Sequence, residues 1–405
     1  MIQSEIKTNN NLNPVKLLYI IFIFSFLSGC SLDFDDFVPS FIEDFYEDSE
    51  KIPPLPKFET NVDIKRVWSS SYSGEIEEDN NFISLSILGD RIFFSNNEKS
   101  LYVVSSEDGR LIKKLEVQLG IYSGVSATED IILYGSQEDT VTAVDINTNE
   151  VIWQRILSSE ILAISDIINN RAYVRTSDSK IYAFDADTGE IRWQSIHITP
   201  SLTIRGVSKQ IIGDTALYVG FDDGKVFAYN LDNGGVIWRV DISSKKGKTV
   251  IDRLSDIDGD IKYSDGIIYA VSYQGKVSAI DSSDGKVIWS KEGSSYYGID
   301  VDDKHLFYTD DIGRIFCLDK FSGKIVWLQD SLSMRLIYSP VVYMNNIFVA
   351  DIEGYIHILN PLSGVIHGRI KLDDKIQSIV SKNEDGIFFL DKDINISKFQ
   401  ITEQN

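Results

Sequence analysis

The chain has 405 residues, of which 39 are basic and 61 acidic, so its formal net charge is −22. This balance argues against a nucleic-acid partner, because a protein that neutralises phosphates needs a basic footprint. The hydrophobic content of 43% is that of a folded globular protein, and the two cysteines, Cys30 and Cys317, are too few for a disulfide framework or a multi-cysteine metal site.

Residues 1–29 have the features of a lipoprotein signal peptide. The apolar run LLYIIFIFSFL at residues 17–27 is too short to span a bilayer comfortably. It leads into Leu27-Ser28-Gly29-Cys30, which resembles the bacterial lipobox, where small residues precede a cysteine that is acylated and becomes the new N-terminus. The sequence therefore predicts a lipid anchor on Cys30, with a plain secreted protein or a short membrane anchor as alternatives. Ser31 stands where an aspartate signals inner-membrane retention in many Gram-negative lipoproteins, so the resemblance favours the outer membrane.

Residues 30–57 are predicted to be an acidic tether. The segment SLDFDDFVPSFIEDFYEDSE at residues 31–50 holds eight acidic groups and no basic one, so it cannot offset its ordering entropy by packing on itself. The aromatic residues within it leave a second interpretation, a short docking segment. Prolines at positions 53, 54 and 56 mark the boundary of a folded domain predicted over residues 58–405.

A repeat of about forty residues dominates this domain. Clear copies such as AFDADTGEIRW and AIDSSDGKVIW end in tryptophan, and Asn149 takes the place of glycine in one copy. Lys113 and Gly368 replace tryptophan in two degenerate copies. The eight equivalent positions are Trp68, Lys113, Trp153, Trp193, Trp238, Trp289, Trp327 and Gly368.

Each copy predicts four short strands. β-rich segments flank a D-x-x-T-G turn, in which Asp or Asn bonds back to the backbone and Gly accepts a positive φ. Four strands per forty residues are typical of a propeller blade, and no helical periodicity is sustained. The sequence thus predicts an all-β, eight-bladed β-propeller in which the tryptophans pack between blades.

The two ends of the domain are predicted to build one blade together. The C-terminal segments at 376–380, 386–390 and 394–400 supply three strands, and the strand that ends near Trp68 has no partner of its own. Adding this N-terminal strand to the C-terminal blade closes the ring and removes an exposed sheet edge.

No catalytic or metal-binding motif is present in the sequence. The repeat resembles that of quinone-dependent dehydrogenases, but those enzymes place their cofactor beside adjacent disulfide-bonded cysteines, which this chain lacks. Cys317 is expected to be a small core residue. The prediction is therefore a protein that is not an enzyme and binds no cofactor or metal. A quinoprotein dehydrogenase and a periplasmic propeller that binds a ligand in its central channel are the alternatives.

Two insertions lengthen neighbouring repeats. Trp193 and Trp238 lie 45 residues apart and Trp238 and Trp289 lie 51 apart, against 38 for Trp289 and Trp327. The extra residues fall after Trp193 and Trp238, in connections that lead into the next blade. Enlarged neighbouring loops on one face of a propeller are a favourable place for function.

These insertions carry the segments SLTIRG at residues 201–206 and IDRLSDID at residues 251–258. Together with the lipobox and the repeat, the chain resembles the BamB family of outer-membrane assembly lipoproteins, which has similar segments in the corresponding loops. The resemblance implies a non-catalytic scaffold of the BAM complex that faces the periplasm, binds a POTRA domain of BamA together with the other BAM subunits, and assists the insertion of β-barrel proteins. Unfolded outer-membrane proteins are implied as further partners.

The same resemblance implies roles for five loop residues. Leu202 and Ile204 are expected to be apolar anchors, with Ile204 standing where the family has leucine. Arg205 is expected to donate to a partner carboxylate or carbonyl, and Asp256 and Asp258 to accept from partner amides or cations. The alternative is that Leu202 and Ile204 are buried in a blade while Arg205 pairs internally with Asp256 or Asp258.

Overall fold

The computed structural model describes residues 52–74, 76, 85–96, 99–136, 138–198, 208–243, 257, 259–376, 381–383 and 386–402. By its internal contacts the chain divides into two units, Met1–Ile52 and Pro53–Asn405, and the described residues belong almost wholly to the second. These residues form thirty-two strands, and no helix occurs among them. A helix with the length and apolar character needed to cross a membrane is accordingly not found in the described ranges.

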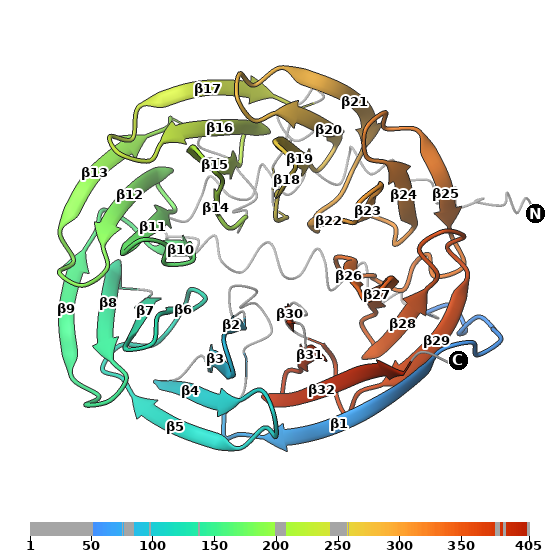
Figure 1. Cartoon of the computed structure of the whole chain (residues 1–405), viewed down its shortest axis with the longest axis horizontal. Coiled ribbons are helices and arrows are strands. Elements are labelled where there is room, and N and C mark those ends of the chain that lie inside the picture. Colours follow the sequence, from blue (N-terminus) through green and yellow to red (C-terminus); the bar gives the residue numbers. More distant parts are fainter. Residues whose placement is uncertain are drawn as a thin grey trace, which may run out of the picture. The chain divides into compact units, whose positions relative to one another are not determined.

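The strands form eight antiparallel sheets of four strands each, arranged as the blades of a ring (Figure 1). Blade 1 contains β2 Ser86–Leu88, β3 Arg91–Ser95, β4 Ser100–Ser105 and β5 Leu111–Glu116. Blade 2 contains β6 Ser126–Ala127, β7 Ile131–Gly135, β8 Thr140–Asp145 and β9 Val151–Ile156. Blade 3 contains β10 Ile161–Ile164, β11 Arg171–Thr176, β12 Lys180–Asp185 and β13 Ile191–Ile196. Blade 4 contains β14 Ile211–Ile212, β15 Ala216–Phe221, β16 Lys225–Asn230 and β17 Val236–Asp241.

The second half of the ring repeats this plan. Blade 5 contains β18 Lys262–Ser264, β19 Ile267–Val271, β20 Gly275–Asp281 and β21 Val287–Gly293. Blade 6 contains β22 Ile299–Val301, β23 His305–Thr309, β24 Ile315–Asp319 and β25 Ile325–Gln329. Blade 7 contains β26 Val341–Tyr343, β27 Asn346–Ala350, β28 Tyr355–Leu359 and β29 Ile366–Lys371. Blade 8 contains β30 Ser381–Asn383, β31 Gly386–Leu390, β32 Asn395–Thr402 and β1 Asp63–Ser71.

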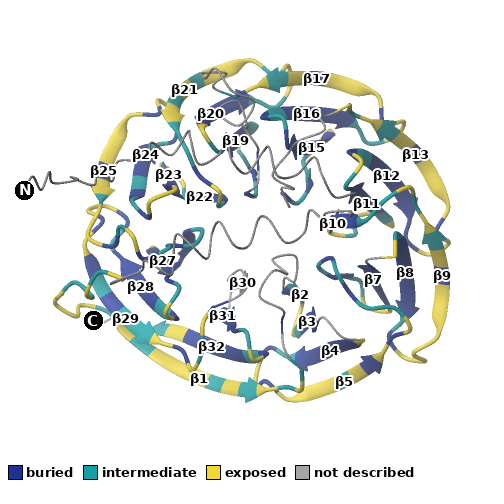
Figure 2. Cartoon of the chain, turned by 180° about the vertical axis from the view of Figure 1, so that it is seen from behind, coloured by how far each residue is buried: buried dark blue, intermediate teal, exposed yellow. Residues whose placement is uncertain are grey.

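Burial explains why the strands differ in composition. The second and third strands of a blade pack on both neighbouring blades, so a strand such as β8, TVTAVD, is buried at five consecutive positions. The outermost strands are covered on one side only, and β9, VIWQRI, buries its tryptophan and exposes most of its other residues. Figure 2 shows this exposed outer rim around a buried interior.

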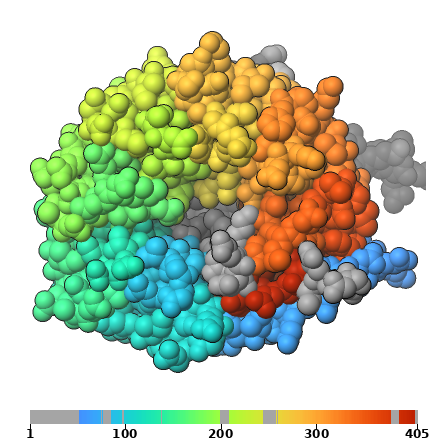
Figure 3. Space-filling model, viewed as in Figure 1, coloured from blue at the N-terminus to red at the C-terminus, as the bar shows by residue number. Residues whose placement is uncertain are grey.

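The ring closes as predicted, with the N-terminal strand completing the C-terminal blade. β1 pairs with β32 from Asp63 opposite Thr402 to Ser71 opposite Asn395. Figure 3 shows the blue N-terminal strand lying against the red C-terminal strands. The innermost described strand of this blade is β30, which pairs with β31 through Asn383 opposite Gly386. Of the predicted segment at 376–380, residues 377–380 lie outside the described ranges.

The tryptophans pack between blades, as the repeat predicted. All eight equivalent positions lie on outermost strands. Each indole Nε1 donates to a carbonyl in the last turn of the following blade, at 2.8–3.3 Å, and the acceptors are Ser106, Ala186, Leu231, Ser282, Lys320 and Pro361. The turn glycine has a positive φ and lies so close to the ring that an added Cβ would come within 2.4–2.8 Å of it. Glycine is therefore required for contact as well as for conformation.

The degenerate copies follow the same logic. Lys113 replaces tryptophan in blade 1, and its ammonium donates to the carbonyls of Ile146 and Asn147 in the next turn. No indole presses on that turn, so Asn149 occupies the glycine place with a φ of 64°. In blade 7, Gly368 leaves room for Val62, whose Cγ1 would lie 2.5 Å from an added Cβ. The entry segment, residues 53–62, thus runs beside β29.

We expect Gly234→Asn to lower the free energy of unfolding by about 2 kcal/mol through overpacking against Trp193. Asparagine tolerates the φ of 68° at this position, so the clash of its Cβ, built at 2.4 Å from the indole, is the main cost. Asn149→Gly is the matched control and should change stability by less than about 1 kcal/mol. Urea denaturation measures both, and equal effects would contradict the packing argument.

The direction of the strands fixes two different faces of the ring. Because neighbouring strands are antiparallel, the turns between second and third strands share one face with the connections from blade to blade. We call this the loop face. It carries the two longest of these connections among blades 2 to 5, residues 197–210 from blade 3 to blade 4 and residues 242–261 from blade 4 to blade 5.

Candidate functional site at the base of two loops

The residues predicted to bind a partner lie outside the described ranges. These are Leu202, Ile204 and Arg205 in the first loop and Asp256 and Asp258 in the second, and the same holds for the predicted lipidation residue, Cys30. The structure does describe the points where both loops leave and re-enter the ring. The site is therefore built from these anchoring residues.

The first loop leaves blade 3 at a closely packed histidine. The backbone amide of His197 donates to the Ser179 carbonyl at 3.1 Å. Its ring lies between Phe221 and Phe227, with centroids 4.7 and 4.5 Å away, and Nε2 lies 3.0 Å from Asp223 Oδ2 in blade 4. The start of the loop is thus fixed to both blades 3 and 4.

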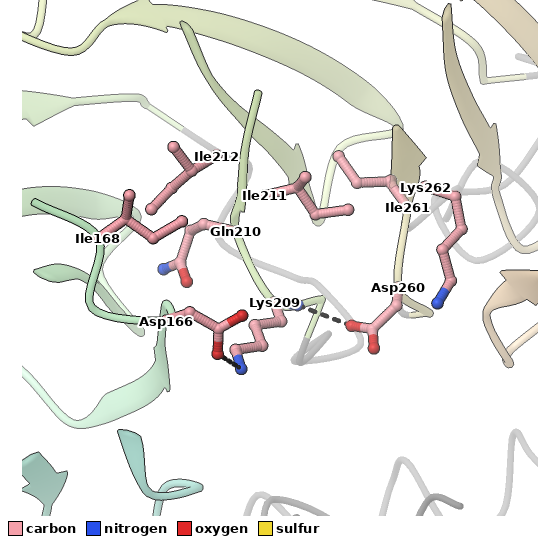
Figure 4. Close-up of a pocket in the computed structure, with 9 residues that line it drawn as sticks. All are labelled: Asp166, Ile168, Lys209, Gln210, Ile211, Ile212, Asp260, Ile261 and Lys262. Atoms are coloured by element: carbon pink, nitrogen blue, oxygen red, sulfur yellow. Dashed lines mark hydrogen bonds and ion pairs between the residues drawn. The ribbon is translucent and has the colours of Figure 1, made fainter. Parts of the chain in front are cut away.

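The ends of the two loops contact each other directly. The backbone amide of Lys209, where the first loop re-enters blade 4, donates to Asp260 Oδ1 at 2.9 Å. Asp260 lies at the end of the second loop. The Lys209 ammonium also binds Asp166 Oδ1 of blade 3 at 2.7 Å, so two bonds from one residue connect three consecutive blades (Figure 4).

The end of the second loop is fixed by burial. Ile257, which stands between the two predicted aspartates, is fully buried, and its amide donates to the Phe221 carbonyl at 3.3 Å. Its side chain packs on Gly220, where an added Cβ would lie 2.6 Å from Ile257 Cγ2. At Gly259 an added Cβ would lie 2.2 Å from the backbone of Gly298, so the two chains approach as closely as glycine permits.

Alternating charges continue this connection into the next blades. Lys262 Nζ lies 3.6 Å from Asp300 Oδ1 of blade 6, and Asp300 Oδ2 accepts the Val342 amide of blade 7 at 2.8 Å. Desolvation opposes the charged form of Lys262, but the carboxylates of Asp300 and Asp260 outweigh it and raise the pKa of the ammonium. The lysine therefore stays protonated at neutral pH.

A buried ion pair joins blades 3 and 4 near the described ends of the loops. Arg175 is fully buried in β11, donates from Nη1 to the Gly220 carbonyl at 2.9 Å and pairs with Asp222. Its guanidinium also lies 5.2 Å from the centroid of the Phe221 ring. The charge of Arg175 is balanced by the ion pair and the hydrogen bond that it forms within the propeller. Arg175 thereby fixes blade 3 against blade 4.

A shallow pocket lies between the inner strands at this point (Figure 4). Isoleucine side chains and charged groups line it together, and the lining residues are Asp166, Ile168, Lys209, Gln210, Ile211, Ile212, Asp260, Ile261 and Lys262. The four charged residues among them are all engaged with one another or with Asp300. This arrangement can hold two loops in register, but it presents no paired acid and base for catalysis.

The two features that suggested other chemistry have structural roles. Cys317 is fully buried in β24, as predicted, and burial raises the pKa of its thiol to about 12, so it is not a reactive thiolate. Among the described residues, no group of three histidine, cysteine or acidic side chains is placed to hold a metal ion.

Sequence reasoning missed the residues that join the loops. Lys209, Asp260 and Asp166 belong to no motif, and their partners come from other blades. A weak signal existed for Arg175, since an arginine interrupts the apolar strand RAYVRTS at a position where the other blades have small or apolar residues. Which residues pair with Arg175 could be seen only from the fold.

The strand plan and the glycine–tryptophan contacts place the chain in the class of eight-bladed propellers built from glycine–tryptophan repeats. Solved structures share this fold. The crystal structure of BamB from Moraxella catarrhalis matches with a TM-score of 0.75 at 22% identity, covering 83% of this chain and 99% of that one. Quinohemoprotein alcohol dehydrogenase from Comamonas testosteroni matches with a TM-score of 0.65 at 10% identity, over 85% of this chain and 77% of that one. These likenesses show the fold alone.

Sequence comparison identifies the family. A family model described as "Outer membrane protein assembly factor BamB" matches residues 97–329. Proteins of that name are similar along most of their length: that of Escherichia coli K12 is 30% identical over 86% of this chain and 88% of its own, and that of Yersinia pestis 28% identical over 84% and 86%. The chain belongs to the BamB family. This confirms the resemblance seen in the sequence and, with it, the prediction of an assembly factor rather than an enzyme.

Proposed function

We propose that this protein is a lipid-anchored scaffold of the outer-membrane protein assembly machinery, whose two long loops dock onto a periplasmic POTRA domain of BamA. Family membership supports the role in assembly, because the relatives are named as outer membrane protein assembly factors. The observation that carries the docking proposal is the hydrogen bond from the Lys209 amide to Asp260, which joins the ends of both loops. Because the ends of both loops are joined at one place, the two loops can form one binding site.

The proposed contacts follow the residue types in the loops. Leu202 and Ile204 supply apolar anchors, Arg205 supplies a forked donor, and Asp256 and Asp258 supply acceptors. Fixing the ends of both loops reduces the entropy that the loops lose on binding, which favours affinity. The fully buried Ile257 supports this point, because it fixes the chain between the two aspartates.

The proposed location depends on the N-terminal residues. Residues 1–29 act as the signal peptide, acyl chains on Cys30 insert into the outer membrane, and residues 30–57 connect the anchor to a propeller that faces the periplasm. The other BAM subunits are then neighbours of the same assembly. Presentation of unfolded outer-membrane proteins to BamA is a second role, for which the exposed outermost strands provide surface.

Replacing Arg205 or Asp256 with alanine tests the docking proposal. If Arg205 is a central contact, Arg205→Ala should cost about 2 kcal/mol or more of binding, roughly 30-fold in affinity. Co-purification of BamA with the anchored protein from outer membranes measures the loss. Arg192→Ala is the matched control, because this arginine is half-exposed on the outer strand of blade 3. Unchanged recovery of BamA with both loop variants would contradict the proposal.

A further inference from the structure

Three isoleucines on the loop face are exposed to an unusual degree. Ile156 ends β9 and is 81% exposed, Ile196 ends β13 and is 60% exposed, and Ile198 follows at 87%. Ile196 and Ile198 are both exposed, whereas the ring of the intervening His197 packs against Phe221 and Phe227. We call these three residues the isoleucine patch.

The repeat supplies an internal comparison for this patch. Ile156 and Ile196 stand three residues after the tryptophan position of their blades. The other six blades have polar or charged residues at that position, namely Ser71, Glu116, Asp241, Glu292, Asp330 and Lys371. Blades 2 and 3 are adjacent, so the two exceptions are neighbours on the rim. At the same exposed strand end, the other blades carry polar side chains. The fold therefore does not require isoleucine there, and the two exposed isoleucines indicate a binding surface.

The exposed apolar residues that precede the tryptophan positions differ from the patch. Positions just before the tryptophan, such as Ile152, Ile237 and Ile288, are 42–48% exposed in several blades. They belong to the general design of the outermost strands. The isoleucine patch is confined to two blades and directly precedes the first long loop.

The surroundings of the patch are acidic. Glu138 and Asp139 lie in a turn of blade 2, and Glu160 lies in the connection from blade 2 to blade 3, all on the same face. Lys180, which pairs with Ile196 across the strands, forms an ion pair with Asp178 at 2.5 Å, so these two charges cancel each other. A matching surface therefore has an apolar centre and basic residues at its edge.

The acidic surroundings of the patch indicate which kind of partner it can bind. A second copy placed on the patch by two-fold symmetry would bring these acidic residues together, which opposes self-association. An anionic lipid surface would be repelled in the same way. The partner that fits the patch is therefore a protein surface edged with lysine and arginine.

We propose that the isoleucine patch extends the partner-docking site onto blades 2 and 3, where it receives an apolar, basic-edged surface of the same protein that binds the two loops. The inference rests on the proposed function. Ile198 supports this continuity, because it leads directly into the loop that carries Leu202, Ile204 and Arg205.

The test is the affinity of the full chain for the purified periplasmic region of BamA. The variant Ile156→Glu/Ile196→Asp/Ile198→Ser introduces residues that other blades use at the same positions, so the ring should fold normally. We expect its affinity to fall at least about tenfold, since buried isoleucine contacts are lost. Ile288→Arg is the control, because Arg192 occupies that position in blade 3, and its affinity should stay within about twofold.

The outcomes separate the two proposals. If the patch variant binds within about twofold of the unmodified chain, while Arg205→Ala does not, the patch inference fails and the loop proposal stands. If the unmodified chain does not bind the BamA region at all, both fail. Self-association in sedimentation that depends on the isoleucines would also overturn the inference, because it would assign the patch to a second copy. Vesicle binding in flotation that depends on them would overturn it as well, because it would assign the patch to lipid.

Discussion

Replacing Arg335 with leucine is expected to lower the free energy of unfolding by about 3–5 kcal/mol, the cost of breaking a buried ion pair. Arg335 lies in the connection between blades 6 and 7, and its Nε donates to Asp351 Oδ2 at 2.8 Å. Both side chains are almost completely buried. Burial alone would raise the pKa of Asp351, but hydrogen bonds from His357, the Tyr355 amide and Arg335 hold it below its usual value. Leucine would leave this carboxylate charged and without its guanidinium.

Urea denaturation at neutral pH measures the loss. Arg192→Leu is the matched control, because Arg192 pairs with Asp185 at 2.6 Å but is half-exposed, and its removal should cost less than about 1 kcal/mol. Arg335 also donates to the Pro53 carbonyl, so its variant should cleave faster in the entry segment under limited proteolysis. A loss no greater than that of the control would show that the pair contributes little.

Removing the N-terminal strand is expected to abolish the stable ring. A chain that begins at Ser73 lacks β1, so β32 loses its pairing from Asn395 to Thr402 and presents a free sheet edge. The same deletion removes Trp68, which donates to the Ser106 carbonyl of blade 1 at 3.3 Å and packs on Gly109. The expected loss is more than about 5 kcal/mol, comparable with the whole stability of a domain. The truncated chain should aggregate or melt without a cooperative transition.

A chain that begins at Pro53 is the control and should melt like the unlipidated full-length protein. Size-exclusion chromatography and circular dichroism compare the two chains. Adding a peptide of residues 53–72 to the shorter chain should restore cooperative melting, because the missing strand can pair with β32 in trans. A monomeric chain from Ser73 with an unchanged melting midpoint would contradict the account of closure.

The fold could be predicted because its signals are local and repeated. Turn chemistry and the tryptophan spacing occur within each forty-residue copy, so eight copies indicate the same blade independently. Even the departures were informative: Lys113 and Asn149 both deviate from the repeat, and the structure shows that Lys113 binds the turn that contains Asn149 across one blade interface.

The base of the site could not be predicted, since its contacts join residues far apart in the sequence. Lys209 binds Asp166 and Asp260, which lie 43 and 51 residues away. Charged residues of this kind look like ordinary surface groups until the ring places them beside neighbouring inner strands. The isoleucine patch, in contrast, could have been found by comparing the repeats position by position, because Ile156 and Ile196 break a polar column.

Site-specific photocrosslinking in cells tests the central claim most directly, namely that two loops with one base form one docking site. A photoreactive residue at position 204 or 258 samples the two loops, and position 112, on the exposed outer strand of blade 1, is the control. The account predicts that positions 204 and 258 both crosslink to the same periplasmic domain of BamA and that position 112 does not. Crosslinks from the two loops to different proteins, or none to BamA from either loop, would contradict it.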